Sequence, residues 1–156
     1  WWRRGFRPGG PLASTCWPRS PATRRDVVST PPDDLSAAAL EFLSERHLAT
    51  LTTLRADGSP HVVPVGFSYD PTDRRVRIIT FSGSRKVTNA ERGGRAAVSQ
   101  VDGGRWLTLE GTVEVTDDPE RVARAVAGYA ARYRTPGERP DRVAIEIAVD
   151  RVLGRV

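Results

Sequence analysis

The sequence is poor in residues that crosslink a chain or bind a metal. It contains one cysteine, Cys16, and two histidines, His47 and His61. A single cysteine cannot form an internal disulfide, and no Cys/His group has the spacing of metal ligands. We therefore expect neither a disulfide scaffold nor a metal centre.

Long apolar segments are missing as well. No hydrophobic run approaches the roughly 20 residues that a membrane-spanning helix requires. Residues 1–33 are rich in Pro, Gly, Ser and Arg. Within them, Arg3–Phe6 and Leu12–Cys16 resemble export and lipoprotein signals, but neither adjoins an apolar region. We expect residues 1–33 to be a disordered, non-functional extension, with export or anchoring as the alternative, and residues 34–156 to be the folded domain of a cytoplasmic protein.

The charge does not favour nucleic-acid binding, although the net charge of the 156 residues is +5. Residues 1–34 hold six arginines and three aspartates and so carry +3 of it. The remaining +2 is spread over 18 basic and 16 acidic residues. A nucleic-acid surface needs a clustered basic face, so we expect no such partner.

Turn residues divide the folded part into short segments. Alternating or β-branched stretches predict six strands, at residues 47–55, 61–69, 75–81, 96–101, 105–115 and 143–149. Ser36, Ser84 and Asp118 are placed as N-caps of three helices. Pro64 and Gly66 weaken the second strand and predict a bulge, or the close approach of a flat ligand. Antiparallel strands with so few helices favour a mainly β fold, a small closed or nearly closed barrel.

The most informative segment is Thr80-Phe-Ser-Gly-Ser-Arg-Lys-Val-Thr-Asn89, which predicts a strand, a turn and a short helix. We expect the Ser84 hydroxyl to accept a bond from a backbone N–H in the first turn. Arg85 and Lys86, the only lysine, fall in that turn. Cations there cost a few tenths of a kcal/mol each, because the helix start already carries partial positive charge. A bound anion would remove the conflict and make this a phosphate cradle; the alternative is a solvated helix start with extended side chains.

This segment resembles a known cofactor-binding motif. Thr80, then residues 84–86 and Asn89 are similar to the run that wraps the cofactor in pyridoxamine 5′-phosphate oxidase-like flavin and deazaflavin proteins. Residues 105–111 match the place where that family has Arg-Gln-x-x-x-x-Gly. The resemblance extends over residues 35–152.

Two further runs narrow the resemblance. Residues 43–57 and 99–103 are similar to the deazaflavin (F420)-dependent biliverdin reductase branch of this family. The resemblance implies a homodimeric, six-stranded antiparallel split β-barrel that binds coenzyme F420. It implies hydride transfer from the reduced deazaflavin to a conjugated small molecule, such as the linear tetrapyrrole biliverdin. The alternatives are an FMN-binding oxidoreductase of the same family and a non-catalytic F420 carrier.

The resemblance also implies a set of cofactor-binding residues. They are His61, Val63, Pro64, Val65, Thr80, Ser82, Ser84, Arg85, Lys86, Asn89 and Trp106. The backbone of residues 61–65 would border the ring, and Asn89 would orient Arg85 and Lys86. Trp106 would be an aromatic plate given by the second chain, or a core residue.

Other roles stay open. No catalytic residue is implied, because the cofactor supplies the hydride. His61 is a weak candidate for a proton donor, and the alternative is that it only ends a turn. Arg132, Arg134 and Arg139 would bind a polyglutamate tail or substrate carboxylates, or belong to a solvated loop.

Overall fold

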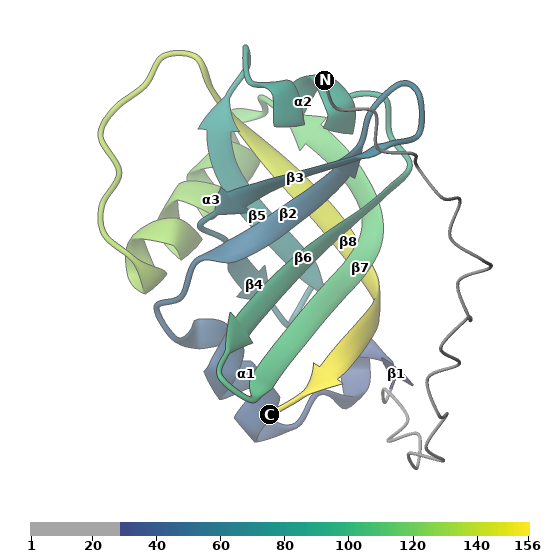
Figure 1. The fold of residues 1–156 in the computed structure, drawn as a ribbon. Coiled ribbons are helices and arrows are strands. Elements are labelled where there is room, and N and C mark those ends of the chain that lie inside the picture. The colour runs from purple at the N-terminus through teal and green to yellow at the C-terminus, as the bar shows by residue number, and fades with distance from the viewer. Residues whose placement is uncertain (1–28) are drawn as a thin grey trace, which may run out of the picture.

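The computed structural model describes residues 29–156. In this part of the chain one antiparallel sheet curls into an incomplete barrel with helices around it (Figure 1). The strands are β1 (Ser29–Thr30), β2 (Ala49–Leu54), β3 (Pro60–Val65), β4 (Ser68–Asp70), β5 (Arg75–Phe81), β6 (Arg95–Asp102), β7 (Arg105–Thr116) and β8 (Arg142–Arg155). The helices are α1 (Ala37–Ser44), α2 (Arg85–Ala90) and α3 (Pro119–Arg132), preceded by the short 3₁₀ helix η1 (Pro32–Asp34).

The order of the strands leaves the barrel split. It runs β3-β2-β6-β7-β8-β5-β4, with β1 on β8. β3 and β4 therefore lie at opposite edges, although only Gly66 and Phe67 separate them in sequence. This confirms the mainly β, antiparallel architecture. The strand predicted at 61–69 is divided in two, and β1 adds another, so the described residues form eight strands rather than six.

The division falls at Gly66 because the chain passes against α3 there. A Cβ at this position would lie 2.8 Å from a ring carbon of Tyr129 and 3.2 Å from one of Tyr133. Real Cβ atoms do not approach that closely, so only glycine fits without a shift. The irregularity predicted from Pro64 and Gly66 is thus a complete break between two strands.

Prolines shape the free edge of β3. Pro60 and Pro64 face Leu54 and Thr50 across the β2–β3 ladder. Proline has no N–H to donate, so these positions turn their hydrogen-bonding side toward the open edge. Val62 shares that side of the strand and carries its remaining N–H. The edge of β3 next to the split is therefore short of donors.

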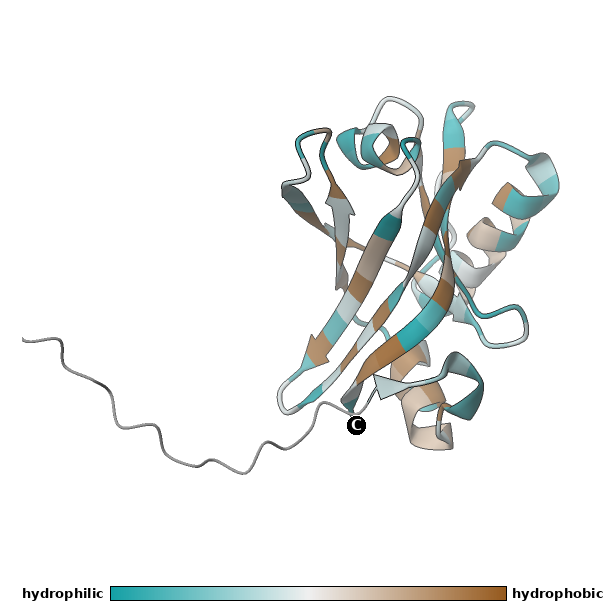
Figure 2. Cartoon of the chain, turned by 90° about the vertical axis from the view of Figure 1, so that its right-hand side faces the viewer, coloured by the Kyte–Doolittle hydropathy of each residue, from teal (hydrophilic) through white to brown (hydrophobic). Residues whose placement is uncertain are grey.

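The core fills the inside of the barrel. Its largest fully buried apolar side chains are Phe42, Phe67, Leu51, Ile78, Leu109, Ile145 and Ile147. Figure 2 shows the matching alternation of apolar and polar residues along the strands. α1 and α2 lie at opposite ends of the barrel, and α3 lies at its side (Figure 1). Two predicted caps are confirmed: Ser36 Oγ accepts from the Ala39 N–H at 3.1 Å, and the Asp118 carboxylate from the Arg121 N–H at 2.9 Å.

One face of the sheet has no helix over it. It is the outer face of β2, β3, β6 and β7, turned toward the viewer in Figure 1. Leu54, Val62 and Val101 are 46%, 56% and 62% exposed there. These are large apolar side chains left in solvent by a single copy of the chain.

The extension predicted at residues 1–33 is described only at its end. Residues 29–33 form β1 and the start of η1, and residues 1–28 lie outside the described part. Among the helices of residues 29–156, none has the length and apolar character needed to cross a bilayer.

Candidate functional site

A pocket of about 740 Å³ opens beside the split of the barrel. The end of β3, the second half of β5, α2, α3 and the loop that follows α3 all contribute to it. Its walls are formed by Pro64, Val65, Gly66, Ile78, Ile79, Thr80, Phe81, Lys86, Tyr129, Arg134, Thr135, Pro136, Gly137, Glu138, Arg139 and Arg142. Four of the predicted site residues, Pro64, Val65, Thr80 and Lys86, thus come together from three separate segments.

The pocket is rich in positive charge. It is lined by Lys86, Arg134, Arg139 and Arg142 and by one carboxylate, Glu138. Arg139 is paired outside this set, because its guanidinium donates to Asp141 at 2.9 and 3.1 Å. The other cations give the pocket an excess of positive charge that can attract an anion.

Lys86 is a half-buried cation without a counter-ion in the described part of the chain. Its side chain is half-buried, and no carboxylate of residues 29–156 lies within 4 Å of its ammonium group. Burial lowers the pKa of Lys86, because the charged form loses hydration. A half-buried ammonium without a counter-ion indicates a site for an anionic ligand.

Phe81 gives the pocket an apolar wall between two cations. The Lys86 Nζ lies 5.8 Å from its ring centre and the Arg139 guanidinium 4.6 Å from it. The Phe81 side chain remains 37% exposed. An exposed ring among cations suits a ligand that is both flat and negatively charged.

The expected role of the Ser84 hydroxyl is wrong. Ser84 has the extended backbone of an N-cap, but its side chain makes no capping bond. Its hydroxyl instead lies 3.3 Å from that of Thr80, at the end of β5. The proximity of the two hydroxyls diverts Ser84 from the helix, so no side-chain acceptor of the described residues satisfies the first-turn N–H groups of α2.

Asn89 also differs from expectation. Its side chain is buried, and its amide donates to the Thr53 hydroxyl at 3.2 Å and accepts from Arg92 at 3.3 Å. It contacts neither Arg85 nor Lys86 through these bonds. Because Thr53 is on β2, Asn89 fixes α2 to the barrel and positions the two cations only indirectly.

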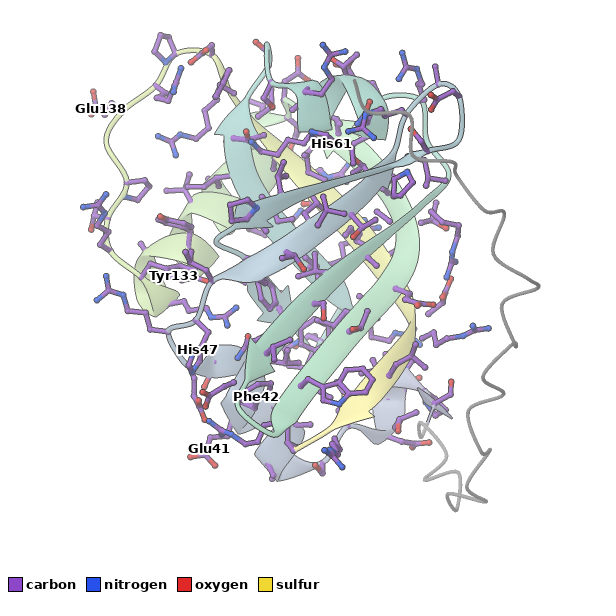
Figure 3. The ribbon with its side chains drawn as sticks, viewed as in Figure 1. Glu41, Phe42, His47, His61, Tyr133 and Glu138 are labelled. Atoms are coloured by element: carbon purple, nitrogen blue, oxygen red, sulfur yellow. The ribbon has the colours of Figure 1, made fainter. Side chains whose placement is uncertain are left out.

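His61 lies next to the cationic start of α2 (Figure 3). Its Nδ1 is buried and has no hydrogen-bond partner in the described part of the protein. Burial lowers the pKa of His61, and the charges of Arg55, Arg85 and Lys86 lower it further. The imidazole is therefore neutral near pH 7.

Like His61, Ser84 and Asn89, the remaining predicted residues do not line the pocket. Ser82 is exposed, and its N–H donates to the Asp141 carbonyl at 3.1 Å. Arg85 is exposed, and Val63 packs against the core. Trp106 is on β7, paired with Val101 and Arg155, away from the pocket of its own chain. The roles of all these residues stay predictions.

Arg132 and Tyr133 form a structural group that the sequence did not indicate. Arg132, expected at a ligand or in solvent, donates to the carbonyls of Glu45 and Phe67 at 2.8 and 2.7 Å and to Gln100 Oε1 at 2.5 Å. The Tyr133 hydroxyl donates to the His47 carbonyl at 2.6 Å and accepts from the Phe67 N–H at 3.2 Å. These bonds hold the linker between β3 and β4, and with it one wall of the pocket. An arginine in the last turn of a helix normally indicates solvent exposure, so no local signal revealed this.

A second polar group lies at the other end of β6. Glu45, His47 and Asp102 lie close enough together to suggest a cation site. However, Arg105 binds Glu45 through two bonds of 2.8 and 3.0 Å and also pairs with Asp102. The carboxylates are therefore already neutralised by a side chain.

Comparison with known proteins agrees with this geometry. The pattern of the pyridoxamine 5′-phosphate oxidase family matches residues 35–155. A Mycobacterium tuberculosis (strain CDC 1551 / Oshkosh) protein named F420H(2)-dependent biliverdin reductase is 59% identical over 120 residues, which are 77% of this chain and 88% of that protein.

Solved structures share the fold. A conserved hypothetical protein from Mycobacterium tuberculosis is 25% identical with a TM-score of 0.66, over 83% of this chain and 86% of that one. A structure named F420 reductase is also 25% identical, with a TM-score of 0.62 over 76% of this chain and 98% of that one. The resemblance inferred from Thr80 and Ser84-Arg-Lys is thereby confirmed, and this chain belongs to the pyridoxamine 5′-phosphate oxidase family.

Proposed function

We propose that this protein is an F420H₂-dependent oxidoreductase that reduces biliverdin or a similar linear tetrapyrrole. The observation that carries the proposal is the half-buried, unpaired Lys86 in a cationic pocket, in a chain 59% identical to an F420H(2)-dependent biliverdin reductase. F420 is an anionic, flat coenzyme, and the pocket offers both excess positive charge and an exposed aromatic wall. The residues present therefore fit the cofactor.

The phosphate of the coenzyme would be held at the start of α2. Lys86 supplies a charge that no carboxylate of residues 29–156 neutralises, and Arg85 adds a second one from the surface. The neighbouring hydroxyls of Thr80 and Ser84 can donate to phosphate oxygens. The N–H groups at the start of α2 that no side chain caps can add to this site.

The ring would lie along Pro64–Gly66. Pro64 lacks an N–H, so a planar group can approach the backbone closely there. Arg134 and Arg142 line the same pocket and can attract the carboxylates of a polyglutamate tail or of a substrate. When bound and reduced, F420 supplies the hydride, and the protein's contribution is to orient the two reactants and exclude water.

We also propose that the protein is a homodimer. The outer face of β2, β3, β6 and β7 has no helix over it and exposes Leu54, Val62 and Val101. Burying such side chains against a second copy is favourable at about 25 cal/mol per Å² of apolar surface. Trp106, which lies outside the pocket of its own chain, would reach the pocket of the partner copy.

The test is a side-by-side titration with F420 and FMN, followed by turnover. We expect F420 to bind more tightly than FMN, and biliverdin absorbance to fall when F420H₂ is supplied. Tight FMN binding with a yellow purified protein would replace the proposal by an FMN-dependent oxidoreductase. F420 binding without reduction of any tetrapyrrole, quinone or enone would identify a carrier. Light scattering or sedimentation tests the dimer.

A further inference from the structure

His61 is an unusual histidine because a buried ring nitrogen has nothing to bond. Its Nδ1 is one of two buried side-chain polar atoms without a partner in residues 29–156. Buried polar groups are nearly always hydrogen-bonded, and each exception needs an explanation. The side chain comes from β3 and lies beside α2 (Figure 3), the helix whose Lys86 lines the pocket; His61 itself is not a lining residue.

The groups that face His61 are positive or neutral. Arg55 comes from the end of β2, and Arg85 and Lys86 from α2. Across the ladder stands Thr53, whose hydroxyl accepts a bond from Asn89 on α2. None of the three cations forms an ion pair with a carboxylate of the described chain. Protonating His61 in the free protein would thus add a fourth positive charge to an uncompensated group.

Of the nearby acids, only Asp57 acts on one of these cations, Arg55, and it leaves Arg85 and Lys86 without a partner carboxylate in residues 29–156. Asp57, in the β2–β3 turn, accepts from the N–H and hydroxyl of Ser59 at 2.9 and 2.7 Å. Glu91 follows α2 at its far end, away from the start that faces the imidazole. In the described residues no carboxylate oxygen lies within 4 Å of a His61 ring nitrogen. An anionic ligand can supply negative charge next to Arg85, Lys86 and the imidazole.

We propose that His61 is a proton-linked ligand of the cofactor's anionic group, neutral in the free protein and protonated when that group binds beside Lys86. This inference rests on the proposed function and adds to it. The anion cancels the repulsion from the nearby cations, so the imidazole can carry a proton. His61 in this role binds and neutralises charge; it does not take part in the hydride transfer.

The sign of the pH dependence follows. The free protein holds the pKa of His61 below its ordinary value of 6.5, and the bound anion raises it. Binding therefore takes up a proton between the two pKa values. Affinity is highest below the free-state pKa and falls as the pH rises toward the bound-state pKa, by at most about tenfold per pH unit for one proton.

NMR tests the proposal directly, because the chain has only two histidines. The ring protons of His61 and His47 are followed from pH 5 to 8.5, with and without saturating F420. We expect the His61 pKa to rise by about one unit or more on binding. His47, on the loop between α1 and β2, serves as an internal reference. An unchanged His61 pKa in the presence of bound F420 overturns the proposal.

Calorimetry in two buffers of different ionisation heat gives a second readout. His61→Asn keeps an N–H donor near the Nδ1 position but cannot titrate. On F420 binding, we expect the wild type to take up as much as one proton more than His61→Asn. Protons taken up or released by the cofactor itself are the same for both proteins and cancel in this difference. His47→Asn is the matched control and should behave as wild type. Equal proton uptake in wild type and His61→Asn contradicts the proposal.

The outcomes separate this proposal from the function it rests on. If F420 does not bind at any pH, the proposed function is wrong. If F420 binds and is turned over while the His61 pKa stays unchanged, the function stands and the proton-linked role of His61 is wrong. The folding of both variants is checked by their unfolding midpoints before binding is measured.

Discussion

Two arginine-rich regions of this protein use the same residue types in opposite ways. In the first, the Glu146 side chain is 1% exposed and accepts hydrogen bonds from Arg75, Arg77 and Arg121 at 3.2–3.3 Å. Glu114 accepts from Arg75 at 2.6 Å and also from Arg121. Every charge in this Glu146 cluster has a partner.

The second region is the pocket. Lys86, Arg134 and Arg142 line it, and no ion pair joins any of them to a carboxylate of residues 29–156. In a buried cluster whose charges are all paired, the ion pairs mainly help to specify one conformation of the fold, because they leave no charge free to attract a ligand. An unpaired cluster keeps its attraction for a ligand. Whether the charges are paired, more than how many arginines are present, therefore distinguishes a structural cluster from a binding site.

The largest effect is expected from a substitution that disrupts the Glu146 cluster. Glu146→Gln leaves three arginines around a neutral amide, and we expect a loss of about 3–5 kcal/mol in the free energy of unfolding. Urea unfolding measures it. Glu110→Gln is the control, because the Glu110–Arg151 pair is 3.8 Å apart and partly exposed, and its loss should cost under about 1 kcal/mol. Equal effects of the two variants would contradict the comparison.

The second largest effect is expected from removing one of the unpaired cations of the pocket. Lys86→Met removes a charge that has no counter-ion in the free protein, so the free energy of unfolding should stay constant or rise. F420 affinity should fall about 10- to 100-fold, the value of one charge-assisted contact. Fluorescence titration measures the affinity. Arg124→Gln, at an exposed position on α3 outside the pocket, should leave it unchanged. Unchanged affinity in Lys86→Met would remove the basis of the phosphate site.

A smaller effect is expected where α3 holds the pocket wall. Tyr133→Phe deletes the bonds to the Phe67 N–H and the His47 carbonyl, and should lower the free energy of unfolding by about 1–3 kcal/mol. F420 affinity should fall as well, because the Pro64–Gly66 wall loses its support. Tyr69→Phe is the matched control: its buried hydroxyl has no partner in the described residues, so its removal should cost nothing. A Tyr133→Phe variant with normal affinity would show that the wall does not depend on the Tyr133 hydroxyl.

The smallest effect is expected on the stability of the fold at acid pH. Ion pairs with Arg121 and Arg75 hold the pKa of Glu114 below its ordinary value of 4.5, against the opposing effect of burial. The folded state therefore binds fewer protons than the unfolded state. This stability is present above about pH 4.5 and is lost as the pH falls through the folded-state pKa. Glu114 is partly exposed, so the loss should stay under about 1 kcal/mol. Glu114→Gln should flatten the slope of unfolding free energy between pH 5 and 3.

Features that depend only on residues close together in the sequence were predicted correctly. Ser36 and Asp118 cap their helices as expected, because an N-cap needs only a side chain and the N–H groups of the next turn. The family was recognisable because Thr80 and residues 84–86 are contiguous enough to read as one motif. The excess positive charge at the start of α2 was visible for the same reason.

Contacts between distant segments were not predictable in this way. The break at Gly66 depends on Tyr129, which follows it by 63 residues. Burial of Arg132 needs three acceptors from three separate segments. Such outcomes are set by the tertiary arrangement, which overrides local preference.

The prolines of β3 have a consequence for the behaviour of the protein in a crowded cell. An unclosed barrel has edge strands with unpaired backbone groups, and such edges can pair with other chains and cause aggregation. With Pro60 and Pro64 on its border, β3 can donate through Val62 alone, so an incoming strand would find almost no ladder to extend. The molecule can keep its opening for a ligand without becoming a seed for aggregation.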